Sequence, residues 1–404
     1  MYDIIIIGGG ASGLYCGLQL CKKYKILLLD DRDYLGGRIH SHKNPSYEIG
    51  AARYHNKQHH LCKLIKKYKL TGYPLSKEVD FIHTKHEYIP CGMDFFHNAI
   101  QDVLNKSKSL SKKYLQSITF KNLCKKFYSN SDVNFLIDVF GYKSEFIDLN
   151  AYEGCNTFSR DFGNQQYFVI GEGMGTLCEK MGDDIKKNKG EIKLNSLVTS
   201  VTQCHDHYSV KVDSKSFDGK KIIFAIKPHQ MKQFHVLSPV FSNLNSVGAG
   251  KLLRIYATFP IDSTHGVWFK GMKRTTTNSF LRHIIPISEE SGLIMISYTD
   301  GPDVDKFLKK KHTLMHDKHI EHMVMDECRK LFKDIEIPKP LYFKSHYWSH
   351  GAHFWKVGYD SDKIINEMIH PVRNIYTCGE GFSKKQAWVE GALESAELVI
   401  RKLL

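Results

Sequence analysis

The sequence has 404 residues, of which 42% are hydrophobic and 25% charged, and its formal net charge is +14. This composition excludes a disordered or fibrous chain and leaves room for two domains with a sizeable core. Because the lysines are scattered and form no basic tail, the charge indicates a solvated surface, with no specific nucleic-acid partner and no membrane partner.

The ten cysteines show no C-x-x-C pair and no regular spacing. We therefore expect reduced thiols in a cytosol-like compartment. The first expected strand starts at residue 2 with no signal peptide before it, and no apolar run approaches the roughly 20 residues that span a bilayer. These features predict a cytoplasmic protein without a membrane anchor.

The N-terminal stretch begins with four consecutive isoleucines, Ile4 to Ile7, which are typical of a strand buried on both faces. Gly8, Gly10 and Gly13 follow in the spacing G-x-G-x-x-G. The first glycine allows a tight turn, and the second lets the backbone approach a pyrophosphate. The third lets the following helix pack on the strand.

Leu14, Gly17, Leu18 and Cys21 recur at helical spacing, so a helix N-terminus is expected to point at the phosphate site. A second apolar run, Ile26 to Leu29, predicts the next strand and ends at Asp30. Asp30 lies 22 residues after Gly8, where an acid accepts a hydrogen bond from a ribose hydroxyl. Strand, turn, helix, strand and acid in this order predict a dinucleotide site, and the alternative is a plain glycine turn.

The residues after the second strand indicate which dinucleotide is bound. Asp30-Asp31-Arg32-Asp33-Tyr34-Leu35-Gly36-Gly37-Arg38 resembles the E-A-R-D-R-V-G-G-R signature of the flavin-containing amine oxidase family. That family binds FAD. The resemblance implies FAD contacts at Gly8, Gly10, Ala11, Ser12, Gly13, Asp30, Asp31, Arg32, Gly36, Gly37 and Arg38. Asp30 stands where the family has Glu, a shorter reach with the same chemistry.

The stretch Glu48-Ile49-Gly50-Ala51-Ala52-Arg53 resembles the family's D-x-G-A turn, which returns to the flavin. The resemblance implies cofactor contacts at Gly50, Ala51, Ala52 and Arg53. Its form Gly-Ala-x-Arg is most similar to the L-amino-acid oxidase branch, in which the Arg forms a bidentate pair with the substrate carboxylate. Arg53 therefore indicates an amino acid over a simple amine. The alternative is that Arg53 contacts only the cofactor or a surface acid.

The family resemblance fades from residue 71 to about residue 163, and helices are expected before and within this region. Residues 55–70 predict one helix, with Leu61, Leu64, Ile65 and Tyr68 on one face. Further helices are expected at residues 93–104, 120–128 and 132–140. In the family this region belongs to the substrate domain, and it predicts no particular pocket residue.

The resemblance returns at residues 167–174, which match the family's G-G-M turn before a helix that leads back to the cofactor domain. Short strands are expected at residues 191–195, 197–201, 208–212 and 221–226. Val198 occupies a position whose backbone contacts adenine in relatives. Ala225 begins a stretch similar to the A-x-P end of that sheet. Cofactor contacts at Val198 and Ala225 are therefore implied.

The stretch from Gly248 to Ile255 resembles the family strand whose lysine holds a water against flavin N5. The resemblance assigns Lys251 to the oxygen half-reaction, where a buried ammonium would stabilise a superoxide-like negative charge. The alternative is an ordinary surface lysine. Strands at residues 279–285 and 292–298 are expected to continue the substrate-domain sheet.

Residues 304–332 predict one long helix that carries four histidines at spacings of three and four, His312, His316, His319 and His322. Such spacing could chelate zinc or nickel. The alternative is an exposed helix in a histidine-rich protein. Because no Glu or Cys completes a metal motif, we assign no metal.

The C-terminal residues carry the second set of family motifs. Residues 375–380 resemble l-y-f-A-G-E, and residues 388–396 resemble G-Y/W-V-E-G-A-x-x-S-G. In relatives this strand-to-helix turn lies against the isoalloxazine and ribityl chain, where the helix dipole favours negative charge at N1 and O2 of the reduced flavin. The resemblance implies that the Val389 N–H binds O2 and that Trp388 walls the substrate. The cofactor contacts implied here are Gly379, Glu380, Trp388, Val389 and Ala392.

His353 and Phe354 lie where relatives place the other half of an aromatic cage. With Trp388, one of them is expected to orient the amine. Monoamine oxidases have a Cys in this stretch that bonds the flavin covalently, but this chain has Ala352. We therefore expect noncovalent FAD.

The fold implied is α/β, a two-domain FAD-binding Rossmann-type fold with an inserted α+β substrate domain, as in amine oxidases. Residues 1–70, 165–240 and 346–404 are expected to form the FAD-binding domain. Residues 71–164 and 241–345 are expected to form the substrate domain.

The function implied is an FAD-dependent oxidase that transfers hydride from an amine or L-amino-acid C–H to flavin N5. The imine product would hydrolyse to an aldehyde or keto acid and ammonia, and O₂ would reoxidise the flavin and form H₂O₂. One alternative is an FAD enzyme that acts on a non-amine substrate. Another is a degenerate flavin-binding protein kept for structure or partner binding. The lysine-rich, compact form resembles amine-oxidase-like proteins of large DNA viruses. Such an origin would place the protein in the host cytoplasm or in the virion. The sequence leaves open whether the protein forms a homodimer.

Overall fold

The computed structural model describes residues 1–84, 92–162 and 165–404 of the chain. The chain divides into two compact units. Unit 1 comprises Met1–Leu75, Asn164–Gly248 and His353–Leu404, and unit 2 comprises Ser76–Gly163 and Ala249–Ala352. Each unit is thus built from segments that are far apart in the sequence.

Unit 1 contains a mixed sheet in the order β10-β11-β12-β1-β2-β9, with β18 paired to β12. Its strands are β1 (Tyr2–Ile7), β2 (Ile26–Leu29), β9 (Glu191–Lys193), β10 (Val198–Gln203), β11 (Tyr208–Val212), β12 (Lys215–Phe224) and β18 (Ile375–Thr377). The central strand β1 pairs in parallel with both β2 and β12. The isoleucines Ile4 to Ile7 are buried, which confirms the prediction of a strand covered on both faces.

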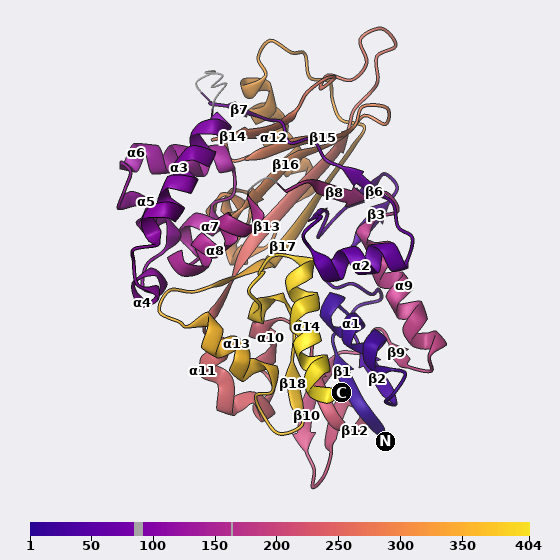
Figure 1. The fold of residues 1–404 in the computed structure, drawn as a ribbon. Helices are drawn as coiled ribbons and strands as arrows, with labels where there is room; N and C mark the ends of the chain where they lie inside the picture. Colours follow the sequence, from indigo (N-terminus) through magenta and orange to yellow (C-terminus); the bar gives the residue numbers. More distant parts are fainter. Residues whose placement is uncertain (85–91, 163–164) are drawn as a thin grey trace. The chain divides into compact units, whose positions relative to one another are not determined.

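Helices cover this sheet and close its hydrophobic core. They are α1 (Ala11–Leu20), α2 (His59–Lys67), α9 (Met174–Lys187), α10 (Pro228–Met231), η1 (His235–Val240), α11 (Phe241–Leu244), α13 (Ser361–Ile369), η4 (Glu380–Phe382) and α14 (Val389–Leu403). The C-terminal helix α14, yellow in Figure 1, packs beside the N-terminal helix α1. The predicted helix over residues 55–70 is shorter than expected, because Tyr54 and His55 pair with strand β8.

Two small sheets complete unit 1. One is the hairpin of β3 (Ser41–Lys43) and β4 (Ser46–Glu48), and the other joins β5 (Tyr54–His55), β8 (Tyr167–Ile170) and β6 (Gly72–Pro74). The turn after β8 leads into α9 as predicted. In the large sheet, the parallel strands β1, β2, β12 and β18 all end at one edge. In an open α/β sheet, ligands bind at this carboxyl edge.

Unit 2 contains a second sheet in the order β17-β13-β16-β15-β14-β7. Its strands are β7 (Val79–Ile82), β13 (Val247–Thr258), β14 (Arg274–Thr277), β15 (His283–Ser288), β16 (Leu293–Asp300) and β17 (Tyr342–Trp355). Helix α12 (Asp317–Leu331) covers one face, where Ile320 and Val324 pack with Leu253 and Ile296. The predicted strand at residues 292–298 is confirmed, whereas the strand predicted from residue 279 begins only at His283.

A cluster of helices forms the rest of unit 2. They are α3 (Gly92–Ser107), α4 (Lys112–Gln116), α5 (Phe120–Lys125), α6 (Asn130–Phe140), α7 (Ser144–Ile147) and α8 (Ala151–Asp161). The helices predicted at residues 93–104, 120–128 and 132–140 are confirmed, and α4, α7 and α8 were not predicted. Side-chain caps mark several starts, because Ser111, Thr119, Ser129 and Asn150 each accept a hydrogen bond from an N–H three residues on.

The prediction of one helix over residues 304–332 is wrong. The segment forms η2 (Gly301–Phe307), η3 (Lys310–His312) and then α12. Leu308 and Thr313 are extended, and His316 caps the N-terminus of α12 by accepting a hydrogen bond from the Lys318 N–H. Only His319 and His322 remain on the helix, and His322 pairs with Asp326 at its surface. The four histidines therefore share no helix face.

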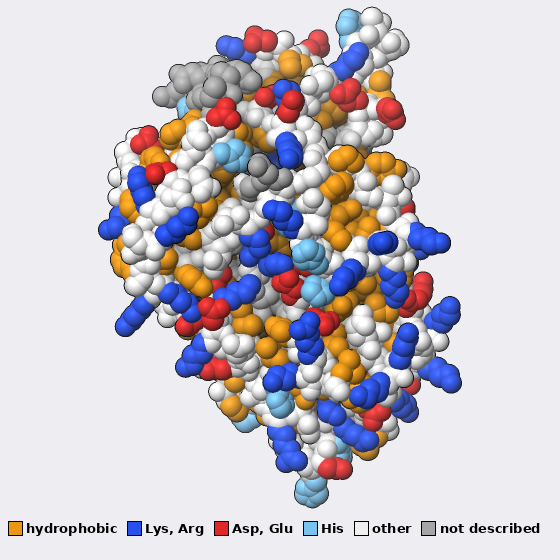
Figure 2. Space-filling view, viewed as in Figure 1, with side chains coloured by type: hydrophobic (Ala, Val, Ile, Leu, Met, Phe, Trp, Pro, Cys, Tyr) orange, Lys and Arg blue, Asp and Glu red, His pale blue; other side chains and the backbone are white. Residues whose placement is uncertain are grey.

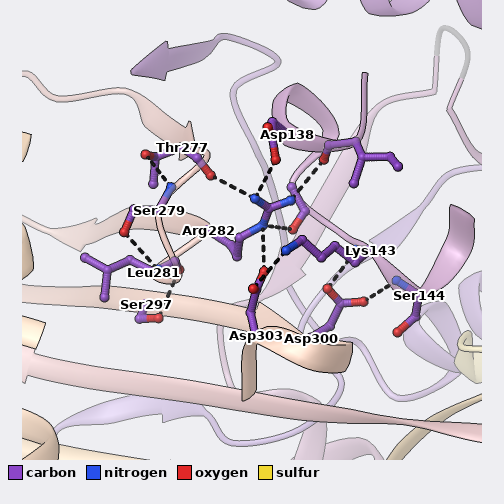
Figure 3. A network of polar contacts seen from close by, with 12 residues as sticks. Asp138, Lys143, Ser144, Thr277, Ser279, Leu281, Arg282, Ser297, Asp300 and Asp303 are labelled. Carbon is purple, nitrogen blue, oxygen red and sulfur yellow. Dashed lines mark hydrogen bonds and ion pairs between the residues drawn. The ribbon is translucent and has the colours of Figure 1, made fainter. Parts of the chain in front are cut away.

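A buried polar network joins α6 to the sheet of unit 2 (Figure 3). The Arg282 side chain is fully buried and binds the carboxylates of Asp138 and Asp303 at 2.9 and 3.4 Å. Its guanidinium also donates to the Ile137 carbonyl at 3.2 Å. Asp300 accepts hydrogen bonds from the backbone N–H groups of residues 143 and 144, both at 2.8 Å.

Charged side chains are spread over the molecular face drawn in Figure 2, where acidic groups lie among the lysines and arginines. This distribution agrees with the solvated surface expected from the sequence. Among the residues that the structure describes, every helix is too short or too polar to cross a bilayer.

Candidate active site

The glycine turn after β1 is closed on one side, because the backbone of unit 1 lies where side chains would be. A Cβ on Gly8 would lie 2.6 Å from the Ala225 oxygen, and Gly8 has a φ of +109°. A Cβ on Gly13 would lie 1.9 Å from the Gly8 oxygen. Both positions therefore require glycine, as the G-x-G-x-x-G spacing predicts.

The opposite side of the same turn is open. A Cβ on Gly10 would meet nothing nearer than the Gly36 oxygen at 3.8 Å, and one on Gly37 nothing nearer than Gly10 Cα at 3.5 Å. For Gly379, the nearest atom would be Ser12 Oγ at 4.0 Å. These glycines face a space at the N-terminus of α1, where unpaired N–H groups and the helix dipole favour an anion. We call this space, bordered by Gly10, Gly37, Gly379 and Ser12, the glycine cradle.

Asp30, at the end of β2, forms hydrogen bonds with both loops that border the cradle. Asp30 is buried and accepts hydrogen bonds from the Gly9 N–H at 2.5 Å and the Arg32 N–H at 2.9 Å. Burial raises the pKa of this carboxyl, and the two N–H groups oppose the rise. The sequence had not singled out Gly9. The predicted contact of Asp30 with a ribose stays a prediction.

Positive charge gathers beside the cradle. The Arg32 guanidinium donates to the Gly37 carbonyl at 2.8 Å, whereas Asp31 is exposed. Lys227, which follows β12, is half-buried, and none of the described residues pairs with its ammonium. Burial lowers the pKa of Lys227 to about 8, and Arg38 and Arg32 contribute to the shift by repulsion. An anion bound here would relieve this repulsion, which fits a pyrophosphate.

Arg38 connects three segments of unit 1. Its guanidinium binds Glu380 Oε1 at 2.5 Å. Its carbonyl accepts the Ala51 N–H at 3.0 Å, and a Cβ on Gly50 would lie 1.8 Å from that carbonyl oxygen. The turn of Gly50, Ala51 and Ala52 is therefore held against Arg38, and its contact with the cofactor stays a prediction.

Arg53 lies among aromatic rings from separate segments. Its guanidinium carbon is 5.4 Å from the ring centre of Tyr167 and 6.0 Å from that of Trp388. The two rings are stacked with an interplanar angle of 20°, and His55 meets Trp388 edge-on. The sequence predicted Arg53 and Trp388 separately, and the structure brings them together. It adds Tyr167 and His55, which sequence reasoning had missed.

Helix α14 begins at Val389, directly after Trp388. Ala392 is buried against the core of unit 1. The neighbouring Glu390 is fully buried and accepts the backbone N–H groups of His60 and Leu61 at 3.0 and 2.9 Å, so it caps helix α2. Its closeness to His60 and Glu394 therefore has a structural explanation without a metal.

The backbone before α14 carries strain. Ala387 has a φ of +65°, a conformation that favours glycine, and its N–H donates to Glu380 Oε2 at 2.9 Å. The family motif has Gly at this position.

We expect Ala387→Gly to raise the free energy of unfolding of the apoprotein by about 0.5 to 1 kcal/mol, since the strain exceeds the entropy cost of glycine. Urea denaturation would measure it, and Ala392→Gly within α14 should instead destabilise.

Of the two residues proposed for the cofactor sheet, Val198 begins the edge strand β10 and Ala225 directly follows β12. Val198 is buried on β10. The Ala225 N–H donates to the Ile7 carbonyl at 2.8 Å, and its own carbonyl lies against Gly8. Ala225 thus helps to shape the glycine turn, whereas the contact of Val198 with adenine stays a prediction.

Lys251 lies within strand β13 of unit 2, and its half-exposed side chain pairs with Asp305. The buried cation of this strand is Arg254, whose guanidinium carbon lies 4.5 Å from the ring centre of Tyr298. The expectation of a buried Lys251 ammonium is therefore wrong. Its role in the oxygen half-reaction stays a prediction.

His353 and Phe354 are consecutive residues of β17 and therefore point to opposite faces of the strand. The Phe354 ring lies against Gly248, which leaves no room for a Cβ there. The His353 side chain is buried and binds Glu380 through Nδ1. These two residues therefore cannot wall the same pocket together.

The cradle, the cations beside it and the helix N-termini of α1 and α14 fit a dinucleotide that carries a pyrophosphate. Together with the parallel β1-β2-β12 core, they define the class of dinucleotide-binding oxidoreductases. The sequence profile described as flavin containing amine oxidoreductase matches residues 11–403. The chain belongs to this family, and FAD is its cofactor. Ala352 offers no thiol, in agreement with noncovalent binding.

Similar proteins agree with this assignment. An uncharacterized protein of Acanthamoeba polyphaga mimivirus is 23% identical over 99% of this chain and 93% of its own length. Horse amine oxidase [flavin-containing] A is 22% identical over 100% of this chain and 85% of its own. Human lysine-specific histone demethylase 2 is 22% identical over 86% of this chain, which spans 46% of that protein.

The fold is also similar to a solved structure. Putrescine oxidase bound to putrescine matches with a TM-score of 0.81 at 14% sequence identity, over 100% of this chain and 98% of that one. The predicted α/β fold of the amine oxidases is thereby confirmed. The protein is an FAD-dependent amine oxidoreductase by family.

Proposed function

We propose that the protein is an FAD-dependent oxidase of L-amino acids. The single observation that carries this proposal is the position of Arg53 over the rings of Tyr167 and Trp388. A guanidinium at this place would repel a substrate whose only charge is an ammonium. It would attract a substrate with a carboxylate, which a planar guanidinium binds through two parallel hydrogen bonds.

The chemistry follows from what surrounds the cofactor. Bound FAD supplies the hydride acceptor for a C–H next to a neutral amine. Trp388 and Tyr167 would orient the substrate, and Arg53 would hold its carboxylate. The N-terminus of α14 at Val389 would stabilise the negative charge that reduction places on the ring. No side-chain base is required for this step.

The Arg53 assignment predicts a change in substrate preference. We expect Arg53→Met to lower kcat/KM for an L-amino acid by about 100-fold, because a charge-assisted pair contributes about 3 kcal/mol. The amine that lacks only the carboxylate should be unaffected or improved. Stopped-flow reduction of the flavin, by the L-amino acid and separately by the amine without the carboxylate, measures the change in substrate preference.

A matched control is Arg401→Met, since Arg401 is exposed and its ion pair with Glu397 lies at the surface of α14. This variant should leave kcat/KM unchanged for both the amino acid and the amine. An equal loss for the amino acid and the amine in Arg53→Met would assign Arg53 to the cofactor and remove the argument for a carboxylate.

Lys251 has its own prediction. If its ammonium assists the reaction with O₂, Lys251→Met should slow reoxidation of the reduced flavin at least about tenfold and leave anaerobic reduction unchanged. Rapid mixing of reduced protein with oxygenated buffer gives this rate. An unchanged rate would make Lys251 a surface partner of Asp305, with a contribution of at most about 1 kcal/mol to stability.

A further inference from the structure

Several buried side-chain atoms of unit 1 have no hydrogen-bond partner among the described residues, and one of them, Nε2 of His353, belongs to a titratable group. Nε2 of His353 is shielded from solvent and makes no hydrogen bond there, and the His353 side chain is 2% exposed. Burying a polar group without a partner costs about 1 to 3 kcal/mol. A ligand atom is the natural candidate for the missing partner, because His353 borders the cofactor region.

The contacts of His353 fix which kind of partner Nε2 needs. Burial alone would raise the pKa of Glu380, but Arg38 and His353 outweigh it and hold that pKa well below its usual range. Glu380 is therefore ionised and accepts a proton-bearing Nδ1. Burial lowers the pKa of His353, although Glu380 opposes the shift, so the ring is neutral. In a neutral imidazole with a proton on Nδ1, Nε2 is an acceptor and needs a donor.

Glu380 also locates the dyad of His353 and Glu380 relative to the cradle. Its Oε1 binds Arg38, which directly follows Gly37 of the cradle. Its Oε2 accepts the Ala387 N–H at 2.9 Å, directly before Trp388 and the start of α14. Gly379, the residue before Glu380, borders the open space. The dyad therefore lies between the predicted pyrophosphate site and the predicted ring site.

The groups of FAD differ in whether they can donate a hydrogen bond to Nε2 of His353. The pyrophosphate and the N1/O2 edge of the flavin accept hydrogen bonds and donate none, so they cannot satisfy Nε2. The ribityl chain joins the pyrophosphate to the ring and carries three hydroxyl donors. We propose that Nε2 of His353 accepts a hydrogen bond from a ribityl hydroxyl of FAD, with Glu380 as the positioning residue. This inference rests on the cofactor and is independent of the substrate.

The test measures cofactor affinity on the apoprotein, without turnover. FAD and its 2′-, 3′- and 4′-deoxyribityl analogues are titrated and followed by flavin fluorescence. In the wild type, one analogue should bind about tenfold more weakly than FAD, the effect of one lost hydrogen bond. In His353→Phe, FAD should lose a similar factor, and the difference between FAD and that analogue should disappear. In His353→Gln, whose carbonyl can replace Nε2, the difference should persist.

His370→Phe is the matched control, because His370 lies in the same unit, is exposed and stacks on Tyr376. It should keep the wild-type ratios. The proposal is overturned if the ratio between FAD and each analogue is the same in His353→Phe as in the wild type, which would assign Nε2 to a water or the substrate. If His353→Phe does not fold, equal binding of all four flavins by the wild type also overturns it.

Discussion

Replacing Gly13 with alanine is expected to yield a colourless protein. A Cβ at this position would lie 1.9 Å from the Gly8 oxygen, in a contact formed by two backbone segments that cannot move independently. Helix α1 would have to shift away from β1, and its N-terminus would leave the glycine cradle. Overpacking of this kind costs up to about 3 kcal/mol, which corresponds to an FAD affinity up to about 100-fold weaker.

The measurement is the flavin absorbance of the purified variant, followed by titration of the apoprotein with FAD. Gly17→Ala is the matched control in the same helix. A Cβ there would lie 2.8 Å from Ile185 Cδ1 and 3.7 Å from Ile6 Cδ1, which are the far ends of two side chains. It should still yield a yellow protein. A yellow Gly13→Ala variant with wild-type affinity would show that the cofactor does not depend on this turn.

Replacing Arg282 with methionine is expected to cause the largest loss of stability among substitutions outside the cofactor site. The guanidinium is fully buried and holds Asp138, Asp303 and the Ile137 carbonyl of α6 in place (Figure 3). Removing it takes a donor from Asp138, from Asp303 and from the Ile137 carbonyl, although Lys143 still pairs with Asp303. Breaking a buried ion pair on one side costs about 3 to 5 kcal/mol.

Urea denaturation of the apoprotein measures this loss. Arg282→Lys should recover little, because one ammonium cannot replace a fork of donors. The control is Arg329→Met on α12, whose side chain is half-exposed and lies 3.7 Å from Asp326. It should change the free energy of unfolding by less than about 1 kcal/mol. A loss below that value in Arg282→Met would mean that the network does not hold α6 to the sheet.

Local patterns explain why the cofactor motifs could be predicted from the sequence. Gly8 and Gly13 are required by backbone contacts, and such contacts admit one residue type at a fixed spacing. The isoleucines of β1 are buried on both faces, and that burial leaves a continuous apolar run. These features depend on few distant residues, so a short segment carries the whole signal.

Contacts between distant segments could not be predicted in this way. His353 and Glu380 each reach Arg38 from more than 300 residues away in the sequence. No local pattern shows that the two would form a buried dyad. Similarly, the apolar spacing of residues 304–332 suggested one helix, but extended residues at 308 and 313 interrupt it. In β13 the sequence favoured Lys251, whereas folding buries Arg254.

The central claim, oxidation of an L-amino acid by bound FAD, is tested most directly by an anaerobic absorbance titration. Purified protein is mixed with pooled L-amino acids and, separately, with pooled amines that lack the carboxylate. We predict that the amino acids bleach the flavin, that the amines do not, and that air restores the colour with formation of peroxide. Bleaching by the amines alone, or by neither pool, would contradict the proposed substrate class.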